Sequence, residues 1–339
     1  MSRHPGQGSP ALIAANNHEN GQTEMIRVVV DAMGGDYAPR EIVRGAVEAA
    51  RQPNIEVILV GQREAVEKEL SGCDLDGARI STCWAEETVS MDEDPVRAIR
   101  RKPNSSIAVG IKLVKSSHSS AFVSGGSTGA VAAAALLILG KKKGISRPAL
   151  GIVFTSPSGP VLFLDVGANP DCRPQHLVQF AEMGNVYMKR IFSISEPRIG
   201  LLSNGEEETK GDKLTRATYQ LLAKGGLNFL GNVEGHDLPR GKADVVVTDG
   251  FTGNVVIKLS EGLGEVFAEL SKQAVDNNPI FREAEKRILN YTALGGAFLL
   301  GVKGNVIITH GRSDAAAIKQ AVRIAEQMVR QRVTEAIGH

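Results

Sequence analysis

The chain has 339 residues, of which 42% are hydrophobic and 23% charged, values that exclude bulk disorder and a collagen-like repeat. Its 39 Lys and Arg residues nearly balance its 38 Asp and Glu residues, so it lacks the basic excess typical of proteins that bind nucleic acids. The three cysteines are too few and too scattered for a disulfide framework or a zinc site, and we expect reduced thiols in a cytoplasmic protein.

Residues 1–24 form a polar segment that is rich in Asn, Gln and Gly and has no aromatic residue. The segment lacks the apolar core of a secretory signal, so we expect a flexible extension ahead of a folded body at 25–339. The longest apolar run, Ala130 to Leu139, has about half the length that a membrane span requires. No Pro- or Ser-rich linker divides the body, which predicts one α/β unit.

From residue 25 onward, short apolar runs alternate with stretches of helical periodicity. Apolar residues at the spacing of one helix face predict helices at 41–51 and 62–70. The short runs predict strands at 26–31, 55–61, 78–84, 119–125, 147–154, 160–167, 196–204, 243–250 and 305–311. Continuous apolar strands separated by helices are typical of a mainly parallel sheet covered on both faces.

Six of these strands are followed by polar turns that contain glycine. The turns are DAMGGD (31–36), SGGSTGA (124–130), DVGAN (165–169), SNGEEE (203–208), TDGFTGN (248–254) and THGRSD (309–314). Ligands of open α/β sheets bind beyond the carboxyl ends of the strands. The six turns therefore predict one large site at that edge, although Gly and Asp also serve simply to form turns.

The turn SGGSTGA is the strongest candidate for phosphate binding. Gly125 and Gly126 allow close approach of the backbone, and Ser127 or Thr128 offers a hydroxyl. The all-apolar run 130–139 predicts a buried helix whose N-terminus directs N–H groups at an anion. A glycine-containing cap that serves only the helix is the alternative interpretation.

Two further turns carry several charged side chains each. Asp31 and Asp36 flank Gly34 and Gly35, a pattern that suits acid–base work or metal binding, or a turn held by the Asp31 carboxylate. The three glutamates 206–208 precede a predicted helix, where its dipole favours negative charge. Lys210 in the same turn is expected either to hold a phosphate oxygen or to pair with a glutamate.

In THGRSD, Ser313 is the expected N-cap of a helix, and Asp314 suits its first turn. Capping does not explain His310 or Arg312, which we expect at the sheet edge. The sequence has no CxxC or HExxH motif, and a covalent nucleophile is not evident.

Seven motifs, read together, carry a resemblance that runs from about residue 25 to 329. They are DAMGGDYAP, DEDPVRAIRRKPNSS, VSGGSTGA, LDVGANPDC, RIGLLSNGEEETKG, VVTDGFTGN and HGRSDAAAIKQA. In this order they resemble the bacterial phosphate acyltransferases of the PlsX family. The resemblance implies a three-layer α/β/α sandwich with a mainly parallel sheet, similar to phosphate acetyltransferases and isocitrate-type dehydrogenases. It also implies a homodimer without metal or organic cofactor.

The activity that the resemblance implies is transfer of a fatty acyl group from acyl carrier protein to inorganic phosphate. The acyl phosphate product feeds phospholipid synthesis, which implies functional contact with a membrane glycerol-3-phosphate acyltransferase and peripheral membrane association. An enzyme that uses acyl-CoA, like phosphate acetyltransferases, and a non-catalytic regulator that binds the carrier remain open alternatives. A decarboxylating dehydrogenase would need an NAD site and a cluster of metal-binding carboxylates.

The resemblance also assigns roles to residues of the matching motifs. Catalytic roles fall to Lys210, His310, Asp249 and Asp31. Substrate-binding roles fall to Gly34, Gly35, Asp36, Arg100, Lys102, Ser124, Ser127, Thr128, Asn169, Asn204, Glu206, Gly253, Asn254 and Arg312. Many members have Asn where this chain has Ser127, and their membrane-binding helical hairpin corresponds to about 255–300, with VDNNP at 275–279. Arg97, Arg101 and the lysines 141–143 are candidates for docking the carrier.

Overall fold

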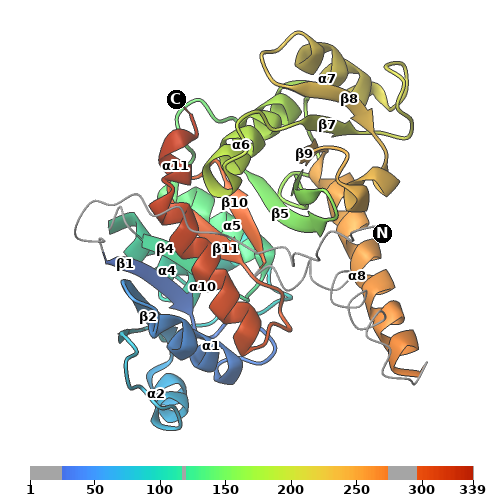
Figure 1. Cartoon of the computed structure of the whole chain (residues 1–339). Coiled ribbons are helices and arrows are strands. Elements are labelled where there is room, and N and C mark those ends of the chain that lie inside the picture. Colours follow the sequence, from blue (N-terminus) through green and yellow to red (C-terminus); the bar gives the residue numbers. More distant parts are fainter. Residues whose placement is uncertain (1–24, 117–119, 274–295, 339) are drawn as a thin grey trace.

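The computed structural model describes residues 25–116, 120–273 and 296–338. These residues form an 11-stranded sheet with the order β3-β2-β1-β4-β11-β10-β5-β6-β9-β7-β8 (Figure 1). The strands are β1 (Ile26–Asp31), β2 (Ile55–Gly61), β3 (Ile80–Trp84), β4 (Ser120–Ser124), β5 (Ala149–Ser156), β6 (Gly159–Leu164), β7 (Ile199–Leu202), β8 (Phe229–Val233), β9 (Val245–Val247), β10 (Ala297–Leu300) and β11 (Asn305–Ile308).

Helices connect most of these strands. They are α1 (Arg40–Ala50), α2 (Arg63–Ser71), α3 (Pro95–Arg101), α4 (Ser106–Ser116), α5 (Thr128–Ala134), α6 (Pro174–Phe192), α7 (Lys213–Ala223), α8 (Gly250–Gln273), α10 (Ala315–Arg330) and α11 (Val333–Ala336). A π-helix, η1 (Ala135–Leu139), continues α5, and a 3-10 helix, η2 (Gly235–Arg240), follows β8.

The sheet contains two parallel groups that run in opposite directions. Strands β3, β2, β1, β4 and β11 are mutually parallel, and so are β6, β9, β7 and β8. Between the groups, β10 is antiparallel to β11 and to β5, and β5 is antiparallel to β6. The two-residue connection between Ser156 and Gly159 requires an antiparallel pair, because parallel strands need a long crossover. The three antiparallel junctions reverse the second group relative to the first.

Helices cover both faces of the sheet, so the expected three-layer arrangement is confirmed. One buried cluster joins the sheet to α1, α6 and α10, and includes Val43, Phe180 and Val322. The other joins it to α3, α4, α5 and η1, and includes Ile99 and Ile111. The regular apolar spacing of α1 and α10 explains why each buries one side against the sheet.

Two strands were missed by the sequence analysis. Strand β8 contains Gly231, with φ of 104°, and Asn232, which interrupt its apolar pattern. Strand β10 is only four residues long and directly follows residues 274–295, which lie outside the described part of the chain. Short or interrupted runs carry little periodicity, so the sheet around them identifies such strands.

The apolar run 130–139 is helical as expected, but it is not buried throughout. Ala135 and Leu139 face the core, whereas Leu136 and Leu137 are 40% and 49% exposed. A helix that covers one face of a sheet has an outer side whatever its composition, so the prediction of complete burial was wrong.

The membrane-facing hairpin expected at about 255–300 is described only in its first arm, α8. Its expected turn at 275–279 lies outside the described residues, as do residues 1–24. Among the described helices, none has the length and apolar character needed to cross a membrane.

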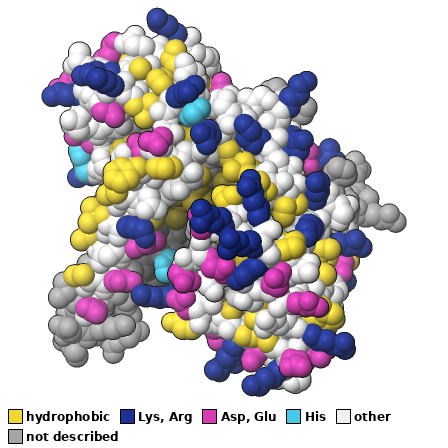
Figure 2. All heavy atoms as spheres, turned by 180° about the vertical axis from the view of Figure 1, so that it is seen from behind, with side chains coloured by type: hydrophobic (Ala, Val, Ile, Leu, Met, Phe, Trp, Pro, Cys, Tyr) yellow, Lys and Arg dark blue, Asp and Glu magenta, His cyan; other side chains and the backbone are white. Residues whose placement is uncertain are grey.

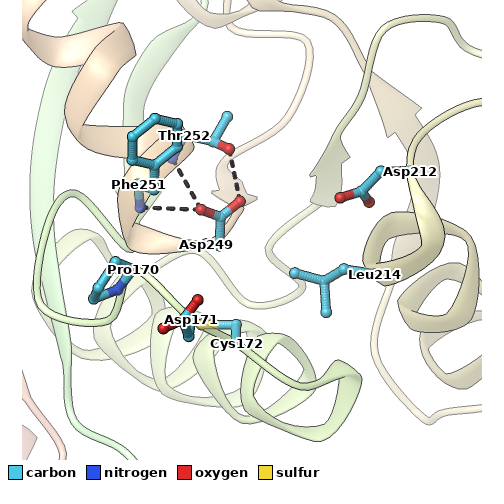
Figure 3. A pocket seen from close by; sticks show the side chains of 8 residues that line it. All are labelled: Pro170, Asp171, Cys172, Asp212, Leu214, Asp249, Phe251 and Thr252. Carbon is cyan, nitrogen blue, oxygen red and sulfur yellow. Dashed lines mark hydrogen bonds between the residues drawn. The ribbon is translucent and has the colours of Figure 1, made fainter.

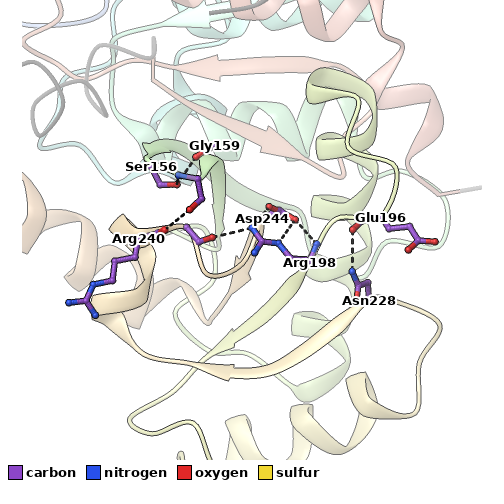
Figure 4. A network of polar contacts seen from close by, with 9 residues as sticks. Ser156, Gly159, Glu196, Arg198, Asn228, Arg240 and Asp244 are labelled. Atoms are coloured by element: carbon purple, nitrogen blue, oxygen red, sulfur yellow. Dashed lines mark hydrogen bonds and ion pairs between the residues drawn. The ribbon is translucent and has the colours of Figure 1, made fainter. Parts of the chain in front are cut away.

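A bidentate ion pair fixes the start of β7 beside β9 (Figure 4). The Arg198 guanidinium donates to the two carboxylate oxygens of Asp244 at 3.1 and 2.8 Å, and to the Gly241 carbonyl at 3.1 Å. The pKa of Arg198 is raised, chiefly by its hydrogen bonds to Asp244. This contact joins the amino-terminal ends of β7 and β9, at the edge of the sheet opposite to the turns that follow these two strands.

Candidate functional site

The six glycine-containing turns divide into two groups of three. The first cluster, residues 31–36, 124–130 and 309–314, follows the adjacent strands β1, β4 and β11. The second cluster, residues 165–169, 203–208 and 248–254, follows the adjacent strands β6, β7 and β9. Because the two strand groups run in opposite directions, the six turns do not line one edge of a single parallel sheet. The expectation that the six turns share one edge of a parallel sheet is therefore corrected.

Glycine is required in the first cluster because the turns meet backbone to backbone. A Cβ atom on Gly34 would lie 2.6 Å from both an Asp31 carboxylate oxygen and the Gly126 nitrogen. One on Gly125 would lie 2.9 Å from the Gly34 carbonyl oxygen, and Gly35 has a positive φ of 111°. The turns 31–36 and 124–130 therefore form one compact unit in which Gly34 and Gly125 have no room for a side chain.

Beneath this unit, Asp31 and Ser124 are fully buried and bonded to each other. The Ser124 hydroxyl donates to Asp31 at 2.7 Å and accepts from the Gly126 N–H at 3.0 Å, while the Met33 N–H donates to Asp31 at 3.1 Å. Burial raises the pKa of Asp31, and the hydrogen bond from Ser124 opposes that rise. In this arrangement Asp31 positions the two turns, which supports the interpretation that its carboxylate holds a turn.

The exposed edge of the first cluster is the start of α5. Ser127 is its N-cap and accepts from the Ala130 N–H at 3.4 Å, so the capping interpretation holds for its oxygen. Its hydroxyl proton stays available for donation. The first-turn N–H groups of Thr128 and Gly129 have no acceptor within the helix, and both residues are exposed. This is the geometry by which helix N-termini bind anions.

The turn at 309–314 closes the first cluster. Gly311 accepts from the Asp36 N–H at 2.7 Å, which joins the turn to DAMGGD. His310 is exposed, and its Nδ1 accepts from the Arg312 N–H at 3.1 Å. The exposed Arg312 guanidinium lies 3.4 Å from Glu265 of α8.

Three residues of this turn differ from expectation or were missed. Asp314, not Ser313, is the N-cap of α10, because its carboxylate accepts from the Ala317 N–H at 2.9 Å. Ser313 is buried. The Thr309 hydroxyl is buried without a hydrogen-bond partner among the described residues, beside the position that a Gly125 Cβ would take. Nothing in the sequence distinguished Thr309, because its isolation arises from tertiary packing.

Arg100 and Lys102, at the end of α3, are both expected to bind substrate, but Lys102 already forms an ion pair. Lys102 donates to Glu93 at 2.7 Å and to the Thr88 carbonyl at 2.9 Å, and this pairing lowers the pKa of Glu93. Arg100 is exposed and forms no ion pair with any residue that the structure describes. The ammonium of Lys102 therefore organises the loop before α3 rather than standing free for a ligand.

In the second cluster, Asp165 is the organising residue, and the sequence analysis did not single it out. Its buried carboxylate accepts from the N–H groups of Leu150, Gly167, Ala168 and Asn169 at 2.8–3.2 Å. Burial raises its pKa against these hydrogen bonds. The Asn169 side chain donates to Asp165 and to the Pro148 carbonyl, both at 2.7 Å, so its amide is occupied structurally.

Asp249 and the residues after it fix the start of α8. The Asp249 carboxylate accepts from the N–H groups of Phe251 and Thr252 at 3.0 and 2.9 Å, and from the Thr252 hydroxyl at 2.7 Å. Gly253 lies so close to the Asp165 carbonyl that a Cβ would collide with it. Asn254 donates to the Val166 carbonyl at 3.2 Å. These residues dock α8 onto the turn after β6.

A pocket of about 400 Å³ opens beside Asp249 (Figure 3). It is lined by Pro170, Asp171, Cys172, Asp212, Leu214, Asp249, Phe251 and Thr252. Asp212 and Leu214 face Asp249 across it. Burial raises the pKa of the Cys172 thiol to about 12, so this cysteine is a poor nucleophile. The three carboxylates and the absence of a lining cation disfavour phosphate here. No metal-binding group of His, Cys, Asp and Glu occurs among the described residues.

The turn after β7 places its charged residues differently from expectation. The glutamates 206–208 precede a helix as expected, but α7 begins only at Lys213, capped by Asp212, so residues 209–212 separate them from its first turn and from its dipole. Glu206 pairs with Lys242, and Asn204 accepts from the Gly211 N–H at 2.8 Å. Lys210 is exposed and forms no ion pair with the described residues. No described contact joins it to the first cluster.

The chain is similar to known proteins over most of its length. The family model described as fatty acid synthesis protein matches residues 26–336, and the chain belongs to this family. A protein of Desulfitobacterium hafniense named phosphate acyltransferase is 49% identical over 325 residues, covering 92% of this chain and 96% of that protein. A Pelotomaculum thermopropionicum protein with the same name is 48% identical over 323 residues, covering 92% and 94%.

Solved structures confirm the predicted fold. A phosphotransacetylase from Streptococcus pyogenes matches 90% of this chain and 94% of its own length, with a TM-score of 0.62 and 20% identity. A 4-hydroxythreonine-4-phosphate dehydrogenase from Klebsiella pneumoniae matches 91% and 100%, with a TM-score of 0.54 and 10% identity. The resemblance to the phosphate acyltransferase family is confirmed by the sequence relatives, and these structures support the architecture.

Proposed function

We propose that the protein transfers a fatty acyl group from acyl carrier protein to inorganic phosphate and releases acyl phosphate for phospholipid synthesis. The observation that carries this proposal is the first cluster, where the exposed N-terminus of α5 and the exposed side chains of His310 and Arg312 lie on turns that meet one another. Membership of a family whose relatives are named phosphate acyltransferases supports acyl transfer to phosphate. That the acyl donor is linked to acyl carrier protein goes beyond the names of these relatives and is part of the proposal.

The reaction needs placement more than it needs a nucleophilic side chain. A phosphate oxygen attacks the thioester carbon, a C–O bond forms, and the C–S bond breaks as the thiolate leaves with the electron pair. The thiolate then takes a proton from solvent or from an acid in the site. The protein must hold a dianion close to the thioester and stabilise the oxyanion that develops.

In the proposed assignment, the N–H groups of Thr128 and Gly129 and the Ser127 hydroxyl hold phosphate. Arg312 neutralises charge on it, since its guanidinium is exposed and its contact with Glu265 is weak and solvated. His310 orients phosphate or protonates the thiolate.

Lys210 is proposed as a second cation for phosphate, together with Arg100. Asp31, Asp36, Asp249 and Asn254 shape the two clusters through their hydrogen bonds and chain contacts. Gly34, Gly35 and Gly253 provide the close approach that these contacts need.

The protein's setting is also part of the proposal. We infer a cytoplasmic homodimer that associates peripherally with the membrane and passes its product to a membrane glycerol-3-phosphate acyltransferase. It needs no metal or organic cofactor and no nucleic-acid partner. The second candidate, an enzyme that uses acyl-CoA, is favoured by the fold shared with phosphotransacetylases.

One assay tests the donor and the acceptor together. The purified protein is incubated with acyl-acyl carrier protein or acyl-CoA, with and without phosphate, and acyl phosphate is trapped with hydroxylamine. We expect phosphate-dependent acyl hydroxamate from the carrier-linked donor at a kcat/KM above that of the CoA-linked donor. A clear preference for acyl-CoA would favour the second candidate, and no hydroxamate from either donor would overturn both.

A further inference from the structure

Seventy consecutive residues, Pro95 to Leu164, contain no Asp or Glu, although the chain has 38 in 339 residues and that average would place about eight here. The same stretch contains ten cations: Arg97, Arg100, Arg101, Lys102, Lys112, Lys115, Lys141, Lys142, Lys143 and Arg147. Since the whole chain has a formal charge of +1 and the stretch +10, the remaining residues sum to −9. The near-neutral total therefore conceals a strong separation of charge.

The fold gathers most of this stretch on one face of the sheet. Helices α3, α4, α5 and η1 all belong to it and pack on the same buried cluster. Pro95 of α3 lies against the first turn of α5, where a Cβ on Gly129 would meet it at 2.7 Å. Buried strands β4, β5 and β6 need no charges, but the outer sides of the helices are exposed to water. Those outer sides carry cations and no carboxylate.

We define the basic helical face as the outer surface of α3, α4 and η1 together with the lysines that follow η1. Its exposed cations include Arg97, Arg101, Lys115 and Lys143, which form no ion pair with the described residues. Lys303 joins them, because its N–H donates to the Gly140 carbonyl at 2.9 Å beside the end of η1. Viewed from behind, the molecule shows Lys and Arg side chains gathered near its centre (Figure 2).

Apolar side chains are exposed among these cations. Leu136 and Leu137 of η1 are 40% and 49% exposed, and Val96 of α3 is 44% exposed. A small anion would use cations alone, whereas a protein surface combines charge with apolar contact. Of the three carboxylates that directly precede α3, Glu93 pairs with Lys102 and Asp94 caps α3, whereas Asp92 is exposed and forms no ion pair with the described residues. One free carboxylate leaves most of the charge of the face uncompensated.

We propose that the basic helical face is the docking surface for the acidic carrier protein that delivers the acyl thioester. This inference rests on the proposed function, because it names where the donor of that reaction binds. The positive charge of the face selects an acidic partner. The location of the face selects the acyl donor as that partner, because α5 begins at the candidate phosphate turn and α5 together with η1 spans at most about 18 Å. A carrier on this face holds its thioester arm within reach of bound phosphate.

Charges of this kind act chiefly on the rate of encounter, and salt screens them beyond about 8–10 Å at physiological ionic strength. The test therefore uses Lys115→Glu and Lys143→Glu, singly and together, because neither residue touches the candidate phosphate turn. Arg323→Glu is the matched control, since Arg323 is an exposed cation on α10, which packs on the opposite face of the sheet. The measurement is kcat/KM for acyl-acyl carrier protein and for acyl-CoA at low and high salt.

We expect the double variant to lower kcat/KM for the carrier-linked donor by about tenfold at low salt, with most of the loss disappearing at high salt. Its kcat/KM for acyl-CoA and that of the Arg323→Glu control for both donors should stay within about twofold of the parent. Retained activity with acyl-CoA shows that the variant is folded. Equal losses in the control, or no loss in the double variant, would overturn the docking surface.

Two arms separate this proposal from its alternatives. If the parent protein makes no acyl phosphate from the carrier-linked donor, the proposed donor fails, irrespective of the variants. If the double variant loses binding to phosphatidylglycerol vesicles but keeps its carrier kinetics, the basic helical face contacts a lipid surface and the proposal is wrong. Carrier kinetics that fall with charge reversal and recover with salt support it.

Discussion

Gly34→Ala is expected to damage the first cluster more than any other single-methyl change in it. The new Cβ would lie 2.6 Å from an Asp31 oxygen, 2.6 Å from the Gly126 nitrogen and 2.9 Å from the Ser124 hydroxyl. Asp31 and Ser124 are buried and bonded to each other, and the third atom is backbone, so none of them can turn away freely. The turns must separate by several tenths of an ångström.

Overpacking of this kind costs about 1–3 kcal/mol, and a domain of 150–250 residues loses about 2–4 °C in Tm for each kcal/mol. We therefore expect Gly34→Ala to lower Tm by several degrees. Because the displaced turn carries the proposed phosphate-binding N–H groups, turnover at a temperature well below Tm should fall at least tenfold, or about 1.4 kcal/mol in activation free energy.

Thermal unfolding followed by circular dichroism and hydroxylamine trapping of acyl phosphate measure the two effects. Gly226→Ala is the control, because a Cβ there would meet nothing within 4 Å, and it should leave both quantities near those of the parent. A Gly34→Ala protein with the Tm and turnover of the parent would refute the close approach of the turns as a requirement for the site.

Three further predictions address single groups. Lys210→Ala should raise the KM for phosphate and lower turnover at least tenfold, and normal phosphate kinetics in the folded variant would remove Lys210 from the site. Burial raises the pKa of Asp31 above its ordinary 3.8, so the folded state binds this proton more tightly than the unfolded state, and the free energy of unfolding falls as pH rises above 3.8. In urea unfolding measured across pH, this decline should be shallower for Asp31→Asn than for the parent. Equal declines in the two proteins would exclude the effect. A double-mutant cycle on Arg198→Ala and Asp244→Ala should give a coupling energy of about 0.5–3 kcal/mol, and additive losses would mean that the ion pair contributes nothing to folding.

The sequence by itself determined the local elements and the chemistry of the turns. Apolar runs located the strands at 26–31 and 55–61 with the bounds that the structure has, because a buried strand must be apolar along its length. Glycine next to polar residues marked the turns at 31–36 and 124–130, because only glycine permits the backbone contacts found there. The motifs also sufficed to place the chain in its family.

Only the tertiary structure decided which turns meet and which side chains are free. The three antiparallel junctions around β10 and β5 separate the six turns into two clusters, and strand order is not encoded in the periodicity of any single strand. Pairing with Glu93 occupies Lys102, whereas Lys210 remains unpaired among the described residues, although both are lysines in charged turns. Leu136 is exposed although it lies within an apolar run, because no element that the structure describes covers its side of the helix. Burial and pairing depend on neighbours that are distant in sequence, and folding alone brings those neighbours together.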